Sequence, residues 1–506
     1  SVKDEYHIAD AYTQRESDKV VVPEKQPNKG APASAEDVEG RTLTERNIQE
    51  EALTRMQSRS IRSFGLEDVR NKAKQDKKCV FTSLLHYLTP KLLRESFYKL
   101  NRDAVAGIDG ETWNSYKVKL EDRLEMLCSE IHQGSYRAKP VLRSYIDKED
   151  GSKRPLGITS VEDKLVQQAI CTILGSIYEQ DFVGVSYGFR PDRSQHDALD
   201  ALSTAIYKRK IGWILDADLQ KFFDTIVHEK LTMFLKHRIG DKRILRLISK
   251  WLKTGYSEEG KIYRQTIGTP QGSVISPFLA NIYLHYALDL WVDNERKKCP
   301  NGDVIVVRYA DDFVMGFQYK SEGEKYLKAL EKRLEKFGLK LHPVKTRLIE
   351  FGRYAQSNRK NRGMDEPETF NFLGFTHICE KSTLGYYFIK RITIKKKSDA
   401  KLKKVFEDLH KRKHRPVHVT GKWLASVVRG FTNYYGVPGN SKSITAFRWL
   451  IVRYWKKTLN RRSQKGIKLT WEKFSKIAAY YIPVPKICHE YPEVRFALTR
   501  SKSRMR

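Results

Sequence analysis

The sequence predicts an α+β fold, in which short antiparallel strands and amphipathic helices are followed by a mostly helical part. Two apolar runs indicate strand pairs: Val304–Met315, interrupted by Asp311 and Asp312, and Val141–Ile158, interrupted by a polar loop. Beyond Ile394, apolar residues recur mainly at helical spacing.

Each predicted element follows from its apolar spacing and from the turn residues at its ends. The predicted helices cover Thr42–Lys74, Ser83–Leu100, Glu111–Gln133, Val161–Gln180, Glu229–Thr254, Pro277–Arg296, Ser321–Gly338, Ser398–His410, Gly421–Tyr435 and Ser441–Leu459. Besides the strands around Asp311–Asp312, we expect an acidic strand from Trp213, a hairpin around Gly260, and strands at Val141–Ile146, Arg154–Ile158, Lys340–Leu341, Thr346–Phe351 and Phe370–Thr376.

Composition divides the chain into four parts. Residues 1–80 form a polar tail and a helical extension, and residues 81–390 hold most of the strands and helices. Residues 391–475 are helical, and residues 476–506 form a short basic segment.

Charge is the second strong signal, because the 506-residue chain has a formal charge of +33 and a pI near 9.7. From Lys390 onward there are 31 Lys and Arg residues against 6 Asp and Glu, so +25 lies in this stretch. Aromatic residues alternate with the basic ones there. Lys and Arg for phosphates and flat rings for bases indicate a nucleic-acid surface. A merely solvated basic face is the alternative.

The six cysteines are scattered without a C-x-x-C pair, which argues against a zinc ribbon or disulfide scaffold and suits a reducing compartment. No apolar run is long enough to span a bilayer, and the residues from Ser1 do not resemble a signal peptide. We therefore expect a cytoplasmic protein, in the bacterial cytosol or nucleoid, without a membrane partner.

The adjacent Asp311 and Asp312 are the most informative residues. Two carboxylates held together resist ionising unless a cation neutralises them, and hard oxygen ligands favour Mg²⁺, with Mn²⁺ as the alternative. In the upstream acidic strand, Asp216 and Asp218 share one face. If that strand lies beside the hairpin, Asp218 completes a three-carboxylate cluster able to hold two metal ions about 3.5–4 Å apart. A solvent-exposed Asp-Asp turn is the alternative; we expect Asp216 and Asp224 to be structural acceptors or caps.

A series of motifs in a fixed order carries a family resemblance. They are Lys148 with Gly151–Ile158, Gly188–Ser194, Asp218–Asp224, Pro270–Pro277, Tyr309–Asp312, Phe372–Phe375, Trp423–Gly430 and Asn433–Gly436. In this order they resemble the reverse transcriptases encoded by bacterial group II introns, the reverse transcriptase–maturases, over roughly Ser83 to Met505.

The resemblance implies a right-hand polymerase. Residues 81–390 would be the fingers and a palm with an antiparallel sheet, residues 391–475 a thumb that doubles as the maturase domain, and residues 476–506 a DNA- or RNA-binding remnant. The Cys- and His-rich endonuclease module of many members is expected to be lacking. The implied activity is RNA-templated addition of deoxynucleotides to a DNA primer, together with binding of a structured group II intron RNA to aid splicing and retrohoming. The implied partners are that RNA, an RNA template with a DNA primer, and dNTPs; a homodimer stays open.

The resemblance also assigns site residues. The catalytic residues are Asp218, Asp311 and Asp312, which would bind two Mg²⁺ together with the backbone carbonyl of Leu219. The nucleotide-binding residues are Lys148, Arg154, Phe223 and Gln271. The template- and primer-binding residues are Arg190, Arg193, Tyr309, Gly272, Phe372, Leu373 and Gly374. The RNA-binding residues of the thumb are Trp423, Arg429, Asn433, Tyr434 and Tyr435.

Several alternatives stay open at this point. Arg190 and Arg193 could anchor a loop, Phe223 could belong to the core, and Lys345 could assist the leaving group or be an ordinary surface lysine. For the whole protein, the alternatives are a splicing cofactor whose polymerase is incidental, and a host-recruited enzyme for phage defence, repair or CRISPR spacer acquisition, which the long N-terminal extension could mark.

Overall fold

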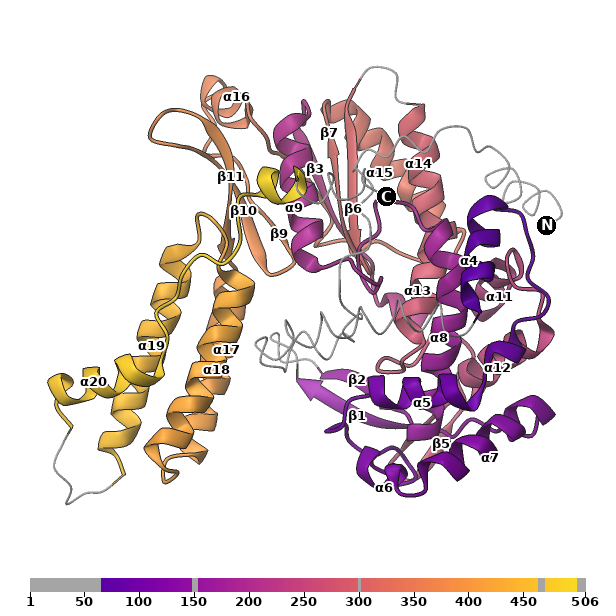
Figure 1. Ribbon diagram of the computed structural model, residues 1–506. Helices are drawn as coiled ribbons and strands as arrows, with labels where there is room; N and C mark the ends of the chain where they lie inside the picture. Colours follow the sequence, from indigo (N-terminus) through magenta and orange to yellow (C-terminus); the bar gives the residue numbers. More distant parts are fainter. Residues whose placement is uncertain (1–64, 148–152, 299–301, 463–468, 498–506) are drawn as a thin grey trace.

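The computed structural model describes residues 65–147, 153–298, 302–462 and 469–497 (Figure 1). Helices and antiparallel strands alternate in these residues and a helical unit follows, which confirms the predicted α+β class. Residues 1–64, with much of the predicted Thr42–Lys74 helix, and Lys148 lie outside the described residues.

A four-stranded antiparallel sheet, here called the central sheet, occupies the middle of the molecule. Its strand order is β6-β7-β3-β8. The strands are β3 (Trp213–Asp218), β6 (Val304–Tyr309), β7 (Asp312–Phe317) and β8 (Arg347–Glu350). The prediction of strands on both sides of Asp311–Asp312 is confirmed, and the acidic strand β3 lies beside β7, which was the condition for a three-carboxylate cluster.

The strands of the central sheet are apolar on both faces because helices cover both. Successive side chains alternate between two cores: Val304 and Val306 pack in one, while Ile305 and Val307 pack in the other. Helix α15 (Lys320–Glu335) contacts β3 and β7, whereas α9 (Gln195–Lys208) contacts β6. The continuous apolar pattern is therefore that of a buried sheet, not of an exposed hairpin.

A second sheet, here called the hairpin sheet, has the strand order β2-β1-β4-β5. Its strands are β1 (Val141–Asp147), β2 (Lys153–Ile158), β4 (Tyr256–Glu258) and β5 (Lys261–Tyr263). The predicted strand pairs β1–β2 and β4–β5 are both antiparallel. The sequence did not indicate that β4 joins β1 in parallel, which makes this sheet mixed.

Helices surround the hairpin sheet and connect it to the central sheet. They are α4 (Leu66–Gln75), η1 (Leu85–Tyr87), α5 (Pro90–Lys99), α6 (Trp113–Lys117), α7 (Leu120–Gln133), α8 (Val161–Asp181), α10 (Phe222–Thr225), α11 (His228–Lys236), α12 (Lys242–Lys253), α13 (Ser276–Leu284), the π-turn η2 (His285–Asp289) and α14 (Leu290–Lys297). Helix α8 packs against both α4 and α5, which lie beside it in Figure 1. No helix in the described part of the chain is long and apolar enough to cross a bilayer.

Several predicted elements are divided in the structure, and two of them show the cause. The stretch Glu229–Thr254 is two helices: α11 ends at Lys236, and Asp241 then caps α12 by accepting from the Arg243 N–H at 2.9 Å. The predicted strand Phe370–Thr376 is two strands, β9 (Phe370–Phe372) and β10 (Phe375–Lys381), because Leu373 and Gly374 both have positive φ and form a tight turn. Strand β11 (Tyr387–Thr393) completes this three-stranded sheet, and α16 (Ala355–Asn361) precedes it.

The helices α17 (Lys395–Lys411), α18 (Val417–Tyr435), α19 (Ser441–Asn460) and α20 (Trp471–Tyr481) form a C-terminal helical unit with its own core. Phe474, Ala478 and Ile482 are buried in that core beside Trp455. The boundary expected between residues 475 and 476 therefore cuts α20, and the boundary between residues 390 and 391 cuts β11. The first residues assigned to a basic tail are part of the helical core.

Residues 488–497 return from the helical unit to the face of α9. Arg495 bonds Asp197 at 3.3 Å and Asp200 at 3.1 Å, and both carboxylates are nearly inaccessible to solvent. Phe496 packs in the same core as Ile305 and Val307. A segment expected to bind nucleic acid thus completes the core behind the central sheet.

We expect Arg495→Ala to lower the free energy of unfolding by about 2–4 kcal/mol, because it leaves two buried carboxylates with less compensation. Urea unfolding followed by tryptophan fluorescence measures this loss. Arg461→Ala is the control, since that side chain is exposed, and its effect should stay within about 0.5 kcal/mol. Equal midpoints for the two variants would contradict the structural role of the returning segment.

Candidate active site

Three carboxylates meet at one end of the central sheet. In the β3–β7 register, Asp218 lies directly opposite Asp312, and Asp311 precedes Asp312 in the turn between β6 and β7. Burial is the main cause that raises the pKa of Asp312 well above its ordinary value, and the charges of Asp311, Asp216 and Asp218 add to it. Burial and the charge of Asp218 likewise raise the pKa of Asp311. The sheet thus holds together acids that repel one another when ionised.

These carboxylates offer hard oxygen donors that suit Mg²⁺ or Mn²⁺. Among the described residues, however, no three His, Cys, Asp or Glu side chains stand in a metal-binding arrangement. Lys345 Nζ lies 2.7 Å from Asp218 Oδ2. The carboxylate oxygens are thus chemically suited to a divalent ion. An ion at Asp218 has to compete with the Lys345 ammonium group. The sequence left open whether Lys345 assists the leaving group or is an ordinary surface lysine; in the structure it contacts one of the three carboxylates.

Leu219, expected to offer its carbonyl, follows Asp218 and has a buried side chain. It forms an isolated bridge with Leu341, flanked by bonds from Gln220 N to Lys340 O and from His342 N to Asp218 O, both 2.8 Å. The predicted short strand at Lys340–Leu341 is this bridge. It fixes the backbone at the C-terminal end of β3.

The turn between β6 and β7 is held by a buried arginine. Arg308 is fully buried and bonds Asp289 with Nε at 2.7 Å and Nη2 at 2.5 Å. Its Nη1 donates to the Ala310 carbonyl at 2.9 Å, inside the turn itself. Ala310 has φ of 57°, a conformation that costs a non-glycine residue about 1–2 kcal/mol. Arg308 thus stabilises a strained turn that presents Asp311 and Asp312.

Two residues connect this arginine to the segment before α9. The Asn281 side chain accepts from Arg308 Nη1 at 3.0 Å and donates to the Gly188 carbonyl at 2.7 Å. A Cβ on Gly188 would overlap the backbone nitrogen of Ala310 and lie 2.9 Å from the carbonyl carbon of Tyr309. Gly188 is therefore required by the close approach of two backbones. The sequence analysis did not single out Arg308, Asn281 or Asp289; an arginine inside a buried strand was the signal that could have found the first.

Arg190, for which a template contact was expected, makes its hydrogen bonds inside the protein. Its side chain is 4% exposed, pairs with Glu179 at 2.8 Å and donates to the carbonyls of Val183 and Ser186. Arg193 also donates to Ser186 O, at 3.0 Å, and to Gly184 O, at 2.8 Å. Both guanidinium groups anchor the loop before α9, which was the alternative interpretation. The reason is that this loop turns sharply and its carbonyls need internal donors.

Among the residues expected to bind a nucleotide, Arg154 and Gln271 lie on two segments that are joined by a backbone hydrogen bond. Arg154 lies on β2 opposite Ile146, and its charge opposes the burial that raises the pKa of Asp311. The Gln271 carbonyl accepts from Gly157 N on β2 at 2.5 Å, so β2 and the Pro270–Ser273 turn are joined directly. Gly272 has φ of 102°, which favours glycine.

Phe222 and Phe223 divide between the core and the site. Phe222 is 2% exposed, whereas Phe223 is half-buried and its carbonyl accepts from Thr269 N at 2.7 Å. Phe223 thus lies beside the strand end that carries Asp218 and next to the segment leading into Pro270. The Gln271 amide donates to Asp224 Oδ1 at 3.3 Å, which makes Asp224 an acceptor, as expected.

The residues expected at the primer lie where the three-stranded sheet meets α18. Phe372 is 1% exposed, so its ring is core and does not face a ligand. Tyr434 donates its hydroxyl to Leu373 O at 2.8 Å, and a Cβ on Gly374 would lie 3.1 Å from Tyr435 Oη. Tyr309 is half-buried against the same core and lies near the Phe189 ring, at 6.4 Å.

The expected RNA-binding set on the helical unit is therefore only partly exposed. Tyr434 and Tyr435 tie α18 to the turn after β9, and the Asn433 carbonyl accepts from His489 Nε2 at 2.6 Å. Burial raises the pKa of Tyr434 well above its ordinary value, which fits an internal anchor. Trp423 is half-buried under the Arg412 guanidinium, 4.8 Å away, and Arg429 is exposed. The Tyr434 hydroxyl and the Tyr435 ring therefore make contacts inside the protein, and an RNA contact of these two tyrosines stays a prediction.

Comparison with known proteins identifies the class. Residues 146–377, just under half of the chain, match the reverse transcriptase (RNA-dependent DNA polymerase) family. This match covers β2, the central sheet, the Pro270–Ser273 turn and β9, so the part of the chain that carries the three carboxylates is a reverse transcriptase domain.

Relatives narrow this class. The group II intron-encoded protein LtrA of Lactococcus lactis subsp. cremoris is 37% identical over 225 residues, which cover 44% of this chain and 37% of the relative. Protein YkfC of Escherichia coli (strain K12) is 34% identical over 237 residues, 41% of this chain and 62% of the relative. Nuclear intron maturase 4, mitochondrial, of Arabidopsis thaliana is 28% identical over 136 residues, 27% of this chain and 17% of the relative. The chain spans less than two thirds of the length of these relatives. Over these stretches the chain is similar to group II intron-encoded proteins and intron maturases.

We expect Gly188→Ala to destabilise the protein by about 1–3 kcal/mol, because the added methyl group forces the Ala310 turn away. Gly175→Ala is the matched control: no atom lies within 4 Å of its Cβ position in the middle of α8, and alanine should stabilise that helix by about 0.5–1 kcal/mol. Urea unfolding midpoints distinguish the two. Opposite signs are expected, and a shared sign would show that the close approach at Gly188 is not a constraint.

Proposed function

We propose that the chain is an RNA-directed DNA polymerase that adds deoxynucleotides to a DNA primer. The observation that carries the proposal is the convergence of Asp218, Asp311 and Asp312 at one end of the central sheet, beside the turn that contains Gln271. Phosphoryl transfer depends mainly on positioning and charge stabilisation, so it needs no other type of catalytic side chain.

In this proposal the central sheet is the palm, and the hairpin sheet with its helices forms the fingers. The C-terminal helical unit is the thumb. Its α18 helix contacts the turn after β9 through Tyr434, so the thumb is anchored next to the palm strands that would carry the primer.

Asp218, Asp311 and Asp312, with the Leu219 carbonyl, would hold two divalent ions, for which Mg²⁺ is the leading candidate and Mn²⁺ the alternative. When bound, such ions stabilise the attacking and leaving oxygens of the displacement and lower the pKa of the primer hydroxyl. The Arg308 network keeps Asp311 and Asp312 in place without reorganisation, which is what preorganised electrostatic catalysis requires.

The remaining residues bind and orient the substrates. Arg154 is placed to pair with a triphosphate, for which a planar guanidinium is suited. Phe223 lies in α10, shortly after the strand that ends at Asp218, and would limit the space for a ribose 2′-hydroxyl. Gln271 and Gly272 would border the nascent base pair with backbone and amide groups. Lys345 would be displaced from Asp218 toward the leaving phosphates when cations bind.

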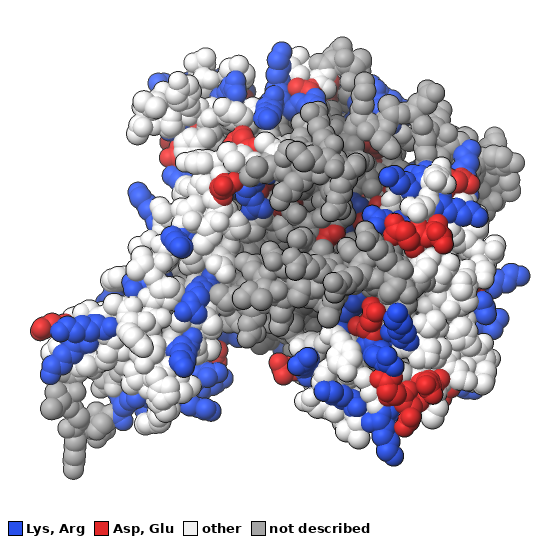
Figure 2. All heavy atoms as spheres, viewed as in Figure 1, with Lys and Arg blue, Asp and Glu red and all other residues white. Residues whose placement is uncertain are grey.

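We propose as a second function that the helical unit binds structured RNA and aids group II intron splicing and retrohoming. Lys and Arg side chains are scattered over its visible face in Figure 2, where Asp and Glu are few. Trp449 is 53% exposed with the Arg453 guanidinium 5.2 Å from its ring, and Lys456 lies 4.8 Å from the ring of Trp471. Exposed rings with adjacent cations suit phosphates and unstacked bases. The names of the intron-encoded and maturase relatives support this function.

Primer extension tests the polymerase function. Purified protein with Mg²⁺ should extend a DNA primer on an RNA template, and EDTA should abolish extension. Asp311→Asn should reduce the rate at least ~10³-fold, because a cation site loses one of its three charges.

Asp365→Asn, at an exposed position, is the control for that substitution and should extend like the wild type. RNA affinity of Asp311→Asn should also be unchanged, since the substitution leaves the helical unit intact. Full extension by Asp311→Asn would remove the proposed catalytic role of the carboxylate cluster.

The salt dependence of RNA affinity tests the second function. Replacing Arg453, Lys456 and Lys457 by alanine should reduce the slope of log affinity against log salt by roughly two to three, because each phosphate contact contributes about 0.7–0.9. The matched control removes three exposed lysines from α15, Lys325, Lys328 and Lys332, and should leave the slope nearly unchanged. Equal slopes for both triple variants would mean that α19 contacts no phosphates.

A further inference from the structure

A buried glutamine supports the turn that contains Gln271. Gln167 on α8 is 2% exposed. Its side-chain carbonyl accepts two bonds, from Ser273 Oγ at 2.8 Å and from Val274 N at 3.1 Å. The end of the Pro270–Ser273 turn is therefore held by one side chain that lies more than a hundred residues earlier in the chain.

The other end of the same turn is bonded to the hairpin sheet. Gly157 N on β2 donates to Gln271 O at 2.5 Å. There is no room for a side chain at this junction, since a Cβ on Gly157 would lie 2.5 Å from Val141 Cγ1 and 3.1 Å from Gln271 O. Any displacement of the turn is thus transmitted to the strand that carries Arg154.

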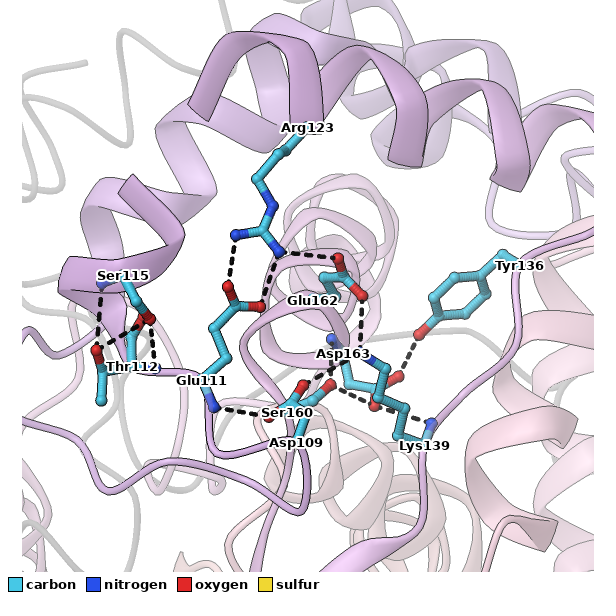
Figure 3. A network of polar contacts seen from close by, with 10 residues as sticks. All are labelled: Asp109, Glu111, Thr112, Ser115, Arg123, Tyr136, Lys139, Ser160, Glu162 and Asp163. Atoms are coloured by element: carbon cyan, nitrogen blue, oxygen red, sulfur yellow. Dashed lines mark hydrogen bonds and ion pairs between the residues drawn. The ribbon is translucent and has the colours of Figure 1, made fainter. Parts of the chain in front are cut away.

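One helical turn before Gln167, the same face of α8 is tied to the start of the hairpin sheet. Asp163 is 2% exposed, accepts from the Tyr136 hydroxyl, from Ser160 Oγ at 2.7 Å and from Lys139 N at 3.1 Å (Figure 3). The Lys139 ammonium group continues the network to Asp109 and Glu162. The segment that leads into β1 is therefore fixed to α8 by buried, satisfied polar contacts.

We propose that Gln167 is a positioning residue for the incoming nucleotide. With Asp163, it makes α8 the common support that sets the separation between the β1–β2 hairpin and the Gln271–Gly272 turn. The inference rests on the proposed polymerase function and extends it. Gln167 contacts no substrate, but it determines the position of the backbone that lines the nucleotide pocket. Loss of its carbonyl should therefore weaken nucleotide binding and leave the chemical step largely intact.

Single-nucleotide incorporation on an RNA template tests this role. Gln167→Leu keeps the side-chain size and removes the acceptor; we expect KM for the dNTP to rise roughly tenfold while kcat stays within about threefold. Gln167→Glu retains an acceptor and should keep KM within about threefold of the wild type. Gln168→Leu is the matched control, because Gln168 is the half-buried neighbour of Gln167 on α8 and its side chain makes no such contact to the turn.

A double-mutant cycle with Ser273→Ala examines the contact itself. Ser273→Ala removes one of the two donors and should raise KM by less than Gln167→Leu. The double variant should be no worse than Gln167→Leu alone, because both substitutions act on one interaction. Amide hydrogen exchange of the peptide that contains Val274 should be faster in Gln167→Leu, a result that does not depend on activity.

Three results would overturn the inference. One is an unchanged KM in Gln167→Leu, and another is unchanged exchange at Val274. The third is a fall in kcat at every nucleotide concentration together with a lower melting midpoint, which would mark Gln167 as structural only. If the wild type itself fails to extend a primer, the proposed function fails and this inference falls with it; extension by the wild type with no difference among the variants refutes the inference alone.

Discussion

The buried ion pair between Arg308 and Asp289 is the interaction on which the candidate active site depends. The guanidinium reaches from inside β6 to the π-turn after α13, to Asn281 and to the carbonyl of Ala310. A buried pair of this kind contributes little net stability, yet removing one partner is costly because the other charge remains buried. Its value here is geometric. It fixes the conformation of the two-residue turn from which Asp311 and Asp312 project.

The site places negative charges together and supplies partial compensation nearby. Lys345 pairs with Asp218, Arg347 lies 3.8 Å from Asp216, and the charge of Arg154 acts on Asp311. Burial and mutual repulsion nonetheless raise the pKa of Asp216 to about 6 and that of Asp312 well above its ordinary range. The positive side chains near the cluster therefore offset its burial and mutual repulsion only in part.

Much of this site could be predicted from local sequence. Period-two alternation placed Asp216 and Asp218 on one face, and two β-branched runs around Asp311–Asp312 indicated the hairpin. The residues that hold the turn between β6 and β7 could not be predicted in the same way, because only the tertiary fold brings them together. They are Arg308, Asn281, Asp289 and Gly188. The internal hydrogen bonds of Arg190 and Tyr434 could not be predicted for the same reason: an arginine or tyrosine looks identical in sequence whether its polar group faces a ligand or a buried carbonyl. For Phe370–Thr376, the Leu373–Gly374 pair was a turn signal within an apparently continuous strand.

The return of residues 488–497 to α9 has a consequence for biosynthesis. Arg495 and Asp197 are 298 positions apart, and Phe496 fills the core behind β6 and β7. At roughly 5–20 residues per second, the ribosome needs on the order of 15–60 s to make the connecting chain. During that interval Asp197 lacks this partner and the apolar face of α9 is incompletely covered. A nascent chain that already contains every carboxylate of the site therefore has to wait for its late-emerging segment before the sheet bearing them is fully packed.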